Sequence, residues 1–351
     1  MKTRNLAITL LSALVFFNSC SDDDDDPKLP LGDYENGYFI SNEGPFQNGS
    51  GTITFVGDDG IVSHNIYKNV NDEDLGNIVN TINFAGDNAY IIVNNSSKIV
   101  VANRYTMEKV TVIEGENISQ PRRVVINGET GYVSNWGDPG NPSDDFIAVI
   151  DLTSNTVTNT IPVGEGPEDM LIENSKLYVN LQGGWSHNNQ ISIINVFSNT
   201  IDVTLNIGDV PNSLIADGQG NIWILCEGIP SWTGSETAGS LIKLNNNNDI
   251  TSFVFDALDH PINLTSESGV MYYNLNGKVY KMNTGSNDLP TVAIDGLDGF
   301  YYAMKIHNGE LFATNAGDFS SEGTLKVFNV NSGTLLETIT AGIVPGDIVF
   351  P

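Results

Sequence analysis

Residues 132–172, YVSNWGDPGNPSDDFIAVIDLTSNTVTNTIPVGEGPEDMLI, contain four β-rich runs in succession. Within each run, Val, Ile, Thr, Tyr and Phe are frequent, and Gly, Pro, Asn and Asp separate the runs, which is the pattern of short antiparallel strands. A long loop follows the first run, a tight turn at 153–156 follows the second, and a bend at Gly166 and Pro167 follows the third. The stretch therefore predicts one four-stranded unit and the start of the next.

The aromatic-led run of this unit recurs along the chain. Its seven copies, at intervals of 40–52 residues, begin at Tyr38, Tyr90, Tyr132, Tyr178, Trp223, Tyr272 and Phe312. A repeat of this length with four strands is typical of β-propellers, in which each repeat forms one blade. The sequence therefore predicts an all-β fold with one domain over residues 36–351, a seven-bladed propeller of four-stranded antiparallel blades.

The two ends of the repeat array predict how the ring closes. The first copy starts at its second strand, near Tyr38, so the first blade has no innermost strand of its own. Residues 345–350, PGDIVF, have the pattern of an innermost strand without a blade. We therefore expect the C-terminal strand to complete the first blade, one strand joining three, which would remove exposed sheet edges.

The N-terminal residues have the features of a secretion signal. Lys2 and Arg4 precede a twelve-residue apolar stretch at 6–17, which is too short for an ordinary membrane span. Because Ser19 and Cys20 follow, residues 1–19 resemble a bacterial lipoprotein signal peptide, with Cys20 as the lipidated residue. The alternative is a plain signal peptide with an incidental cysteine.

Residues 20–35 are predicted to form a lipidated acidic linker, because five aspartates occupy positions 22–26. An acidic run after a lipidated cysteine resembles the surface-export signal of Bacteroidota lipoproteins. It implies an outer-membrane protein that is lipid-anchored and exposed on the cell surface. Retention in the periplasm is the alternative.

The net charge limits the possible partners, and the cysteine content gives one further expectation about the core. The formal net charge of −28 disfavours nucleic acid, because no basic patch can replace phosphate counterions, and it weighs against a strongly anionic ligand. The second cysteine, Cys226, lies in an apolar run and is expected to be a buried, inert thiol.

The loops divide the predicted propeller into two faces. One face, which we call the uniform face, carries short turns of ordinary turn residues at 127–129, 153–156, 197–200, 217–220, 307–309 and 331–334. The opposite face, the variable face, carries loops of differing length and composition at 42–51, 136–145, 182–189, 227–239 and 315–323, and the bends 120–123, 166–168, 211–212, 260–261 and 298–301.

Aromatic residues are concentrated in the variable-face loops. Ligand sites favour aromatic walls with a few polar groups, so we expect a ligand to bind this face. Arg122 and Arg123 lie in one bend, where alternation directs one of them inward; an ion pair with a carboxylate is the alternative. Each tryptophan could instead pack its own loop against a neighbouring blade. The candidate ligand-binding residues on these grounds are Phe46, Arg123, Trp136, Trp185, His187, Trp232 and Phe319.

The sequence carries none of the common catalytic or metal-binding motifs. The sequence contains no CxxC, HExxH, GxSxG or P-loop, so we expect neither enzymatic activity nor a cofactor. Its four histidines fall on different blades, and no metal site is predicted. The least favoured alternative is a hydrolase similar to the propeller lactonases, which hold calcium at the channel mouth, where Glu168, Asn212 and Asn263 are expected.

Two resemblances extend these predictions. YVSN with its partner IPVG resembles the YVTN or YncE-like β-propeller family over residues 36–351. The segments SNEGPFQN (41–48), VNNS (93–96) and GIVPG (342–346) resemble the cobalamin-capturing, BtuG-type surface lipoproteins of Bacteroidota. That resemblance implies that Phe46 and Gln47 contact a corrinoid, and that the protein delivers it to a TonB-dependent outer-membrane receptor. The alternatives are a siderophore as ligand, or a surface scaffold that binds protein or glycan.

Overall fold

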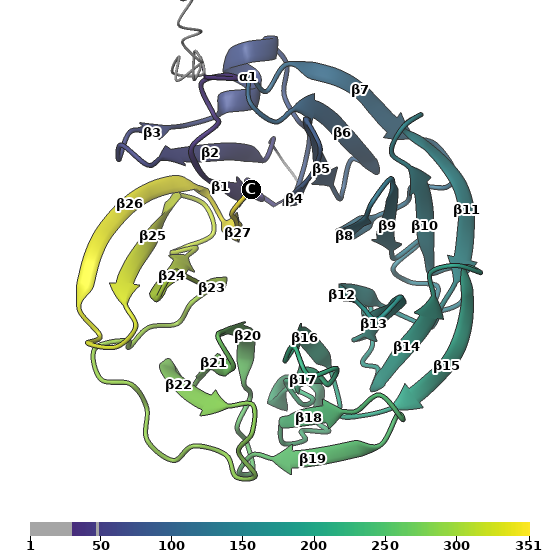
Figure 1. Cartoon of the computed structure of the whole chain (residues 1–351), viewed down its shortest axis with the longest axis vertical. Helices are drawn as coiled ribbons and strands as arrows, with labels where there is room; N and C mark the ends of the chain where they lie inside the picture. Colours follow the sequence, from purple (N-terminus) through teal and green to yellow (C-terminus); the bar gives the residue numbers. More distant parts are fainter. Residues whose placement is uncertain (1–29, 47–48) are drawn as a thin grey trace, which may run out of the picture.

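The structure, a computed structural model, describes residues 30–46 and 49–351. Seven antiparallel sheets are arranged in a ring around a central axis, with one edge strand of each sheet nearest the axis (Figure 1). The predicted signal peptide, Cys20, the aspartate run and Gln47 lie outside the described residues.

The strands follow the chain blade by blade. The first blade contains β1 (Gly37–Asn42), β2 (Thr52–Gly57), β3 (Val62–Ser63) and the C-terminal β27 (Pro345–Val349). The second contains β4 (Val79–Ala85), β5 (Asn88–Val93), β6 (Lys98–Asn103) and β7 (Lys109–Glu114). The third contains β8 (Pro121–Asn127), β9 (Thr130–Asn135), β10 (Phe146–Asp151) and β11 (Thr156–Pro162). The fourth contains β12 (Pro167–Glu173), β13 (Lys176–Leu181), β14 (Gln190–Asn195) and β15 (Thr200–Asn206).

The remaining blades continue in the same order. The fifth contains β16 (Pro211–Ala216), β17 (Ile222–Cys226), β18 (Ser240–Leu244) and β19 (Ile250–Val254). The sixth contains β20 (Ile262–Glu267), β21 (Val270–Leu275) and β22 (Lys278–Asn283). The seventh contains β23 (Met304–His307), β24 (Glu310–Asn315), β25 (Glu322–Asn329) and β26 (Leu335–Ile343). Two short helices, α1 (Ile66–Asn71) and the 3-10 helix η1 (Ser231–Thr233), lie between strands.

Seven apolar clusters fill the spaces between adjacent blades and confirm the predicted number of blades. All seven aromatic positions used to count the repeats lie on second strands, and Trp223 is fully buried against Phe253 with ring centroids 5.7 Å apart. Cys226 is also buried, as predicted, and burial raises the pKa of its thiol to about 12. A thiol with this pKa remains protonated and unreactive at neutral pH.

The sixth blade departs from regular geometry at its outer edge. Every blade was predicted to have four strands, but residues 291–296, which follow β22 where the fourth strand would lie, run irregularly beside it. The Ile294 amide donates to the Val279 carbonyl at 2.8 Å, and Leu297 is fully buried. Pro290 has no amide hydrogen and Gly296 has φ 82°, so a longer ladder is not formed here.

The C-terminal strand closes the ring as predicted. β27 pairs antiparallel with β1, with Ile348 opposite Ile40 and Val349 opposite Phe39. Ile348 is fully buried in the cluster between the seventh and first blades. The last strand of the chain therefore completes the first blade and leaves no inner edge unpaired.

The chain enters the propeller on the uniform face, where the first strand β1 begins. Tyr34 packs edge-on against Phe55 with ring centroids 5.3 Å apart, and its amide donates to the Tyr105 carbonyl at 3.0 Å. The last residues of the predicted linker therefore belong to the folded domain. Within residues 30–46 and 49–351, no helix is both long and apolar enough to span a membrane.

Candidate functional site

The variable face carries almost all of the exposed aromatic side chains in the described part of the chain. Trp185 is 81% exposed, Trp232 82%, Phe46 74% and Phe319 53%. Phe300 and Tyr302, in the connection between the sixth and seventh blades, belong to the same group, whereas Phe197 alone lies on the uniform face. An apolar ring left in water costs free energy in the folded chain, so this one-sided distribution indicates a binding surface.

Two of the predicted residues, Phe46 and Phe319, line one cavity of about 310 Å³ at the junction of the first and seventh blades. We call it the aromatic cavity. Tyr302 packs edge-on against Phe319, with ring centroids 5.6 Å apart, and its hydroxyl donates to Glu43 Oε1 at 2.9 Å. Arg122 lines the same cavity and contributes a cation. The cavity thus combines apolar ring faces with a few convergent polar groups, as small-molecule sites do.

The polar groups of the aromatic cavity are electrostatically coupled. Burial raises the pKa of Glu43, while the hydrogen bond from Tyr302 and the charges of Arg122 and Arg123 lower it. Burial, followed by the charge of Glu43, raises the pKa of Tyr302. The phenol therefore keeps its proton and remains a hydrogen-bond donor at neutral pH.

Trp136 differs from the other two loop tryptophans because it is packed within the protein. Its Nε1 donates to the Pro167 carbonyl at 3.1 Å, and the guanidinium of Arg122 lies 4.3 Å above its ring. Arg122 in turn forms a two-pronged ion pair with Glu168, at 2.7 Å from Nε and 3.0 Å from a terminal nitrogen. Trp136 is therefore packed against the neighbouring blade, and Arg122 is paired with a carboxylate, as the two alternatives in the sequence analysis had it. Neither side chain is free for a ligand in the way that Trp185 and Trp232 are.

Glu168, the carboxylate on which the calcium hypothesis depends, is not free to bind a metal ion. Glu168 is buried, and both of its oxygens accept hydrogen bonds from Arg122, so its charge is neutralised by the protein. The amides of Asn212 and Asn263 donate to the Pro261 and Tyr301 carbonyls. In the described ranges, no group of three histidine, cysteine or acidic side chains is placed to hold a metal ion.

Trp185, His187 and Trp232 lie on the loops of the fourth and fifth blades. Trp185 leans over the neighbouring 136–145 loop, since a β-carbon built on Gly140 would lie 3.8 Å from its ring. His187 is exposed on the same loop as Trp185, and Trp232 lies in η1 on the next blade. These three residues share the variable face, but they do not line the aromatic cavity with Phe46 and Phe319.

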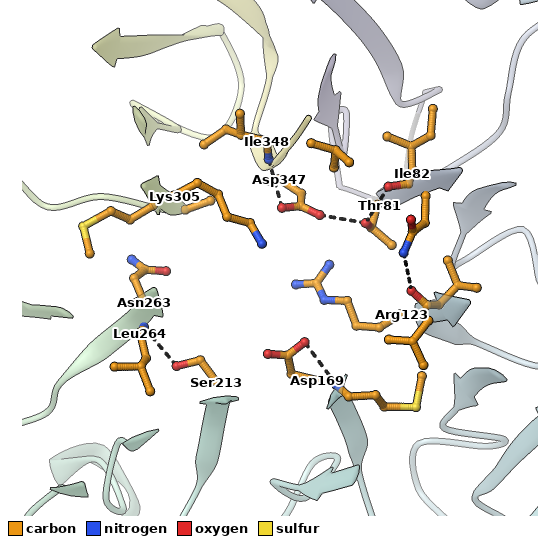
Figure 2. Close-up of a pocket in the computed structure, with 18 of the residues that line it drawn as sticks. Thr81, Ile82, Arg123, Asp169, Ser213, Asn263, Leu264, Lys305, Asp347 and Ile348 are labelled. Atoms are coloured by element: carbon orange, nitrogen blue, oxygen red, sulfur yellow. Dashed lines mark hydrogen bonds between the residues drawn. The ribbon is translucent and has the colours of Figure 1, made fainter. Parts of the chain in front are cut away.

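Arg123 points into the central channel (Figure 2). One of its terminal nitrogens donates to the Asn80 carbonyl at 3.2 Å, and its Nε lies 3.9 Å from Glu168. Alternation along β8 thus separates the two arginines, with Arg122 in the aromatic cavity and Arg123 in the channel.

Glu43 and Tyr302 belong to the site but were not predicted from the sequence. The sequence held a signal for Tyr302, because alternation along the run Phe300–Tyr302 puts its first and last residues on the same side. The structure agrees with that alternation: Phe300 is 80% exposed, Tyr301 4% and Tyr302 40%. Glu43 had no comparable signal, since 259 positions in the sequence separate it from Tyr302.

The closed ring of seven antiparallel sheets makes the protein a seven-bladed β-propeller, and almost all of its exposed aromatic residues lie on the variable face. Residues 36–341 match a sequence family described as a domain of unknown function, DUF5074, and the chain belongs to this family. A comparison with curated proteins finds no match.

Solved structures share the fold at low sequence identity. A quinonprotein alcohol dehydrogenase-like protein from Bacteroides thetaiotaomicron VPI-5482 superposes with a TM-score of 0.66 and 15% identity, covering 90% of this chain and 78% of the other. A functionally unknown protein from Desulfotomaculum acetoxidans gives 0.59 and 15%, covering 90% and 98%. The computationally designed Ika8 protein gives 0.59 and 10%, covering 88% and 90%. At these identities the similarity concerns the fold alone.

Proposed function

We propose that this protein is a surface lipoprotein that captures a scarce small-molecule nutrient on its variable face and delivers it to a TonB-dependent outer-membrane receptor. The observation that carries the proposal is the concentration of exposed aromatic rings on one face, beside a cavity that contains Phe46, Tyr302 and Phe319. The uniform face has no comparable cluster among the described residues, so the asymmetry is not a general property of propeller loops.

A corrinoid is the ligand we favour. Its macrocycle and side chains present a large, mostly apolar surface that can lie against aromatic rings, and its amides can form hydrogen bonds with the Tyr302 hydroxyl. The chain carries a formal charge of −28, which disfavours an anionic ferric siderophore more than a near-neutral corrinoid. The resemblance of the 41–48 and 342–346 segments to cobalamin-capturing propellers supports the same ligand.

The geometry of the termini is compatible with a lipid anchor at Cys20. Tyr34 docks on the uniform face, and the variable face is on the opposite side of the propeller. An anchor attached to residue 20 would therefore tether the propeller from the side opposite its aromatic rings. We propose an outer-membrane location on the cell surface and a binding rather than catalytic role.

The ligand can be tested by titrating the purified full chain with cyanocobalamin while intrinsic tryptophan fluorescence is measured. We expect saturable quenching in the wild type and at least about tenfold weaker binding in Phe319→Ala and Trp185→Ala, since truncating a central aromatic contact costs about 2 kcal/mol. Phe197→Ala is the matched control, because Phe197 is 83% exposed on the uniform face. Unchanged affinity in Phe319→Ala and Trp185→Ala would contradict the proposed site.

A surface scaffold for glycans is the second candidate, because exposed Trp185 and Trp232 could also stack on sugar rings. Binding of oligosaccharides without any response to cyanocobalamin or ferric siderophores would favour the scaffold over nutrient capture. A cyanocobalamin response that is lost in Phe319→Ala would exclude it as the main role.

A further inference from the structure

The central channel is lined by one ring of polar side chains, which we call the channel ring. Each of the seven innermost strands contributes one member (Figure 2). Six members occupy equivalent strand positions, whereas Lys305 lies two residues further along β23, where Ala303 has the equivalent position. In blade order from the first to the seventh, the members are Asp347, Thr81, Arg123, Asp169, Ser213, Asn263 and Lys305. The cavity that they line measures about 430 Å³, within the range of small-molecule sites.

Four members of the channel ring are charged, two cations and two carboxylates. Lys305 lies beside Asp347 on the adjacent blade, and Arg123 lies beside Asp169. No ion pair within 4.0 Å in the described part of the chain joins any two of these four groups. Charges of opposite sign thus face a common space without neutralising each other directly.

The two carboxylates are held in place by uncharged partners. Asp347 accepts a hydrogen bond from the Thr81 hydroxyl at 2.7 Å and one from its neighbouring Ile348 amide at 2.9 Å. Asp169 accepts from the Met170 amide at 3.1 Å and from the Leu214 amide at 3.4 Å. These contacts fix the carboxylates but leave their charges uncompensated.

The guanidinium of Arg123 is fixed by the Asn80 carbonyl at 3.2 Å. It also lies 3.9 Å from Glu168, but both oxygens of that carboxylate accept hydrogen bonds from Arg122, so the charge of Arg123 is only partly compensated. Burial raises the pKa of Asp169, although Arg123 and Lys305 both lower it, so the field of each cation reaches this carboxylate across the channel. Uncompensated charges in a partly desolvated channel are expensive, and Thr81, Ser213 and Asn263 show that uncharged side chains can line it as well. The charges therefore call for a ligand that completes them.

We propose that the channel ring binds a small zwitterion that carries both an ammonium group and a carboxylate, such as a free amino acid. The ligand carboxylate faces both Arg123 and Lys305, and its ammonium group faces both Asp169 and Asp347, so each of the four groups contributes to binding. The ring has two charges of each sign, so a zwitterion leaves the balance unchanged, whereas a simple anion or cation does not. The proposal concerns the channel and does not depend on corrinoid binding at the aromatic cavity.

Isothermal titration calorimetry of the full chain tests this site, with glycine, L-alanine and L-glutamine as probes and acetate and methylammonium as single-charge comparisons. We expect at least one amino acid to bind with a stoichiometry of one. Asp169→Asn and Lys305→Met should each weaken that binding at least about tenfold, because each removes one charge-assisted hydrogen bond. Acetate and methylammonium should also bind at least about tenfold more weakly.

Matched controls come from the same blades. Asp202 lies on the outer strand β15 of the fourth blade, and Lys326 lies on β25 of the seventh. The variants Asp202→Asn and Lys326→Met should therefore bind the amino acid like the wild type. Thermal melts check folding, and neither channel variant should melt below the wild type, since each removes an uncompensated charge. The absence of heat with all three amino acids, equal binding of acetate, or unchanged affinity in Asp169→Asn and Lys305→Met would overturn the proposal.

Discussion

On the uniform face, the turns use nearly all of their polar groups internally, whereas on the variable face rings and charges are left facing solvent. Asp151, Asn195 and Asn329 each accept two backbone amides of the turn that follows them. The hydroxyls of Tyr90 and Tyr132 then donate to Asn155 and Asn199 in the turns of the next blades, at 2.9 and 3.0 Å. Hydrogen bonds within these turns, and between the turns and the neighbouring blades, therefore fix the conformation of the uniform face.

The same strands extend to the variable face, but there the loops differ in length and composition. Trp185, Trp232 and Phe46 are mostly exposed, and Glu43 and Arg122 border a cavity. The repeat therefore constrains the uniform face through its short turns, whereas the loops of the variable face can differ in length and composition. In a propeller with no catalytic motif, the free face and the channel are where binding chemistry can be placed.

Deleting residues 345–351 should have the largest effect, because it removes the strand that supports both faces. The variant loses the β27–β1 ladder and the burial of Ile348, and we expect the melting temperature to fall by more than about 15 °C, or no folded protein. Deletion of Pro351 alone, an exposed residue, is the control. An unchanged melt in the longer deletion would refute closure by the C-terminal strand.

Glu168→Gln should have the next largest effect and should act on the variable face. The substitution leaves Arg122 and Arg123 without their shared carboxylate, and removing one partner of a buried ion pair costs about 3–5 kcal/mol. Urea unfolding followed by circular dichroism measures the loss. Glu165→Gln changes a carboxylate on the same bend that accepts a hydrogen bond from the Ser186 hydroxyl and forms no ion pair among the described residues, so it should cost much less.

Asp145→Asn should change how stability depends on pH. Burial raises the pKa of Asp145 to about 7, and Asp144 and Glu165 add to this, although the Gly166 amide opposes it. An unfolded aspartate titrates near pH 4, so between about pH 4 and pH 7 the folded chain keeps a proton that the unfolded chain releases. Stability from this group therefore falls as pH rises through that range.

The variant removes this pH-dependent term, so Asp145→Asn should melt above the wild type at pH 8 and near it at pH 4. Melting temperatures across that range measure the difference, with the exposed Asp144→Asn as the comparison. A constant gap between variant and wild type over the whole range would show that Asp145 does not titrate as described.

Tyr132→Phe should have the smallest effect and should act on the uniform face. It removes the hydroxyl that donates to Asn199 and to the Val196 carbonyl, which costs about 1 kcal/mol. Ligand affinity should not change, because the turn lies opposite the aromatic cavity. Tyr105→Phe is the control, and an equal loss of stability in both variants would show that the inter-blade bond contributes nothing.

Much of the fold was predictable because each blade repeats a local pattern. The spacing of Tyr132, Tyr178 and Trp223 and their counterparts predicted seven blades, and the PGDIVF segment predicted closure of the first blade, since strand periodicity and turn residues act over short distances. The prediction of a fourth strand in the sixth blade was wrong. Thr291, Val292 and Ile294 have a strand-like composition, but in the structure the backbone hydrogen bond from Ile294 to Val279 does not continue into a regular ladder.

The site was less predictable than the fold. Local sequence indicated which face is variable and which aromatic residues it carries, but it did not distinguish Trp136, packed beneath Arg122, from the exposed Trp185. The aromatic cavity joins Glu43 to Tyr302, and the channel ring joins Thr81 to Asp347.

The amino-acid sequence thus specifies the number of blades, their order and the two kinds of face, because those properties follow from residue periods within one repeat. Which side chains meet across the channel and at the junction of the first and last blades depends on closure of the ring. Closure brings residues from opposite ends of the chain into hydrogen-bonding distance, and no local pattern encodes that distance.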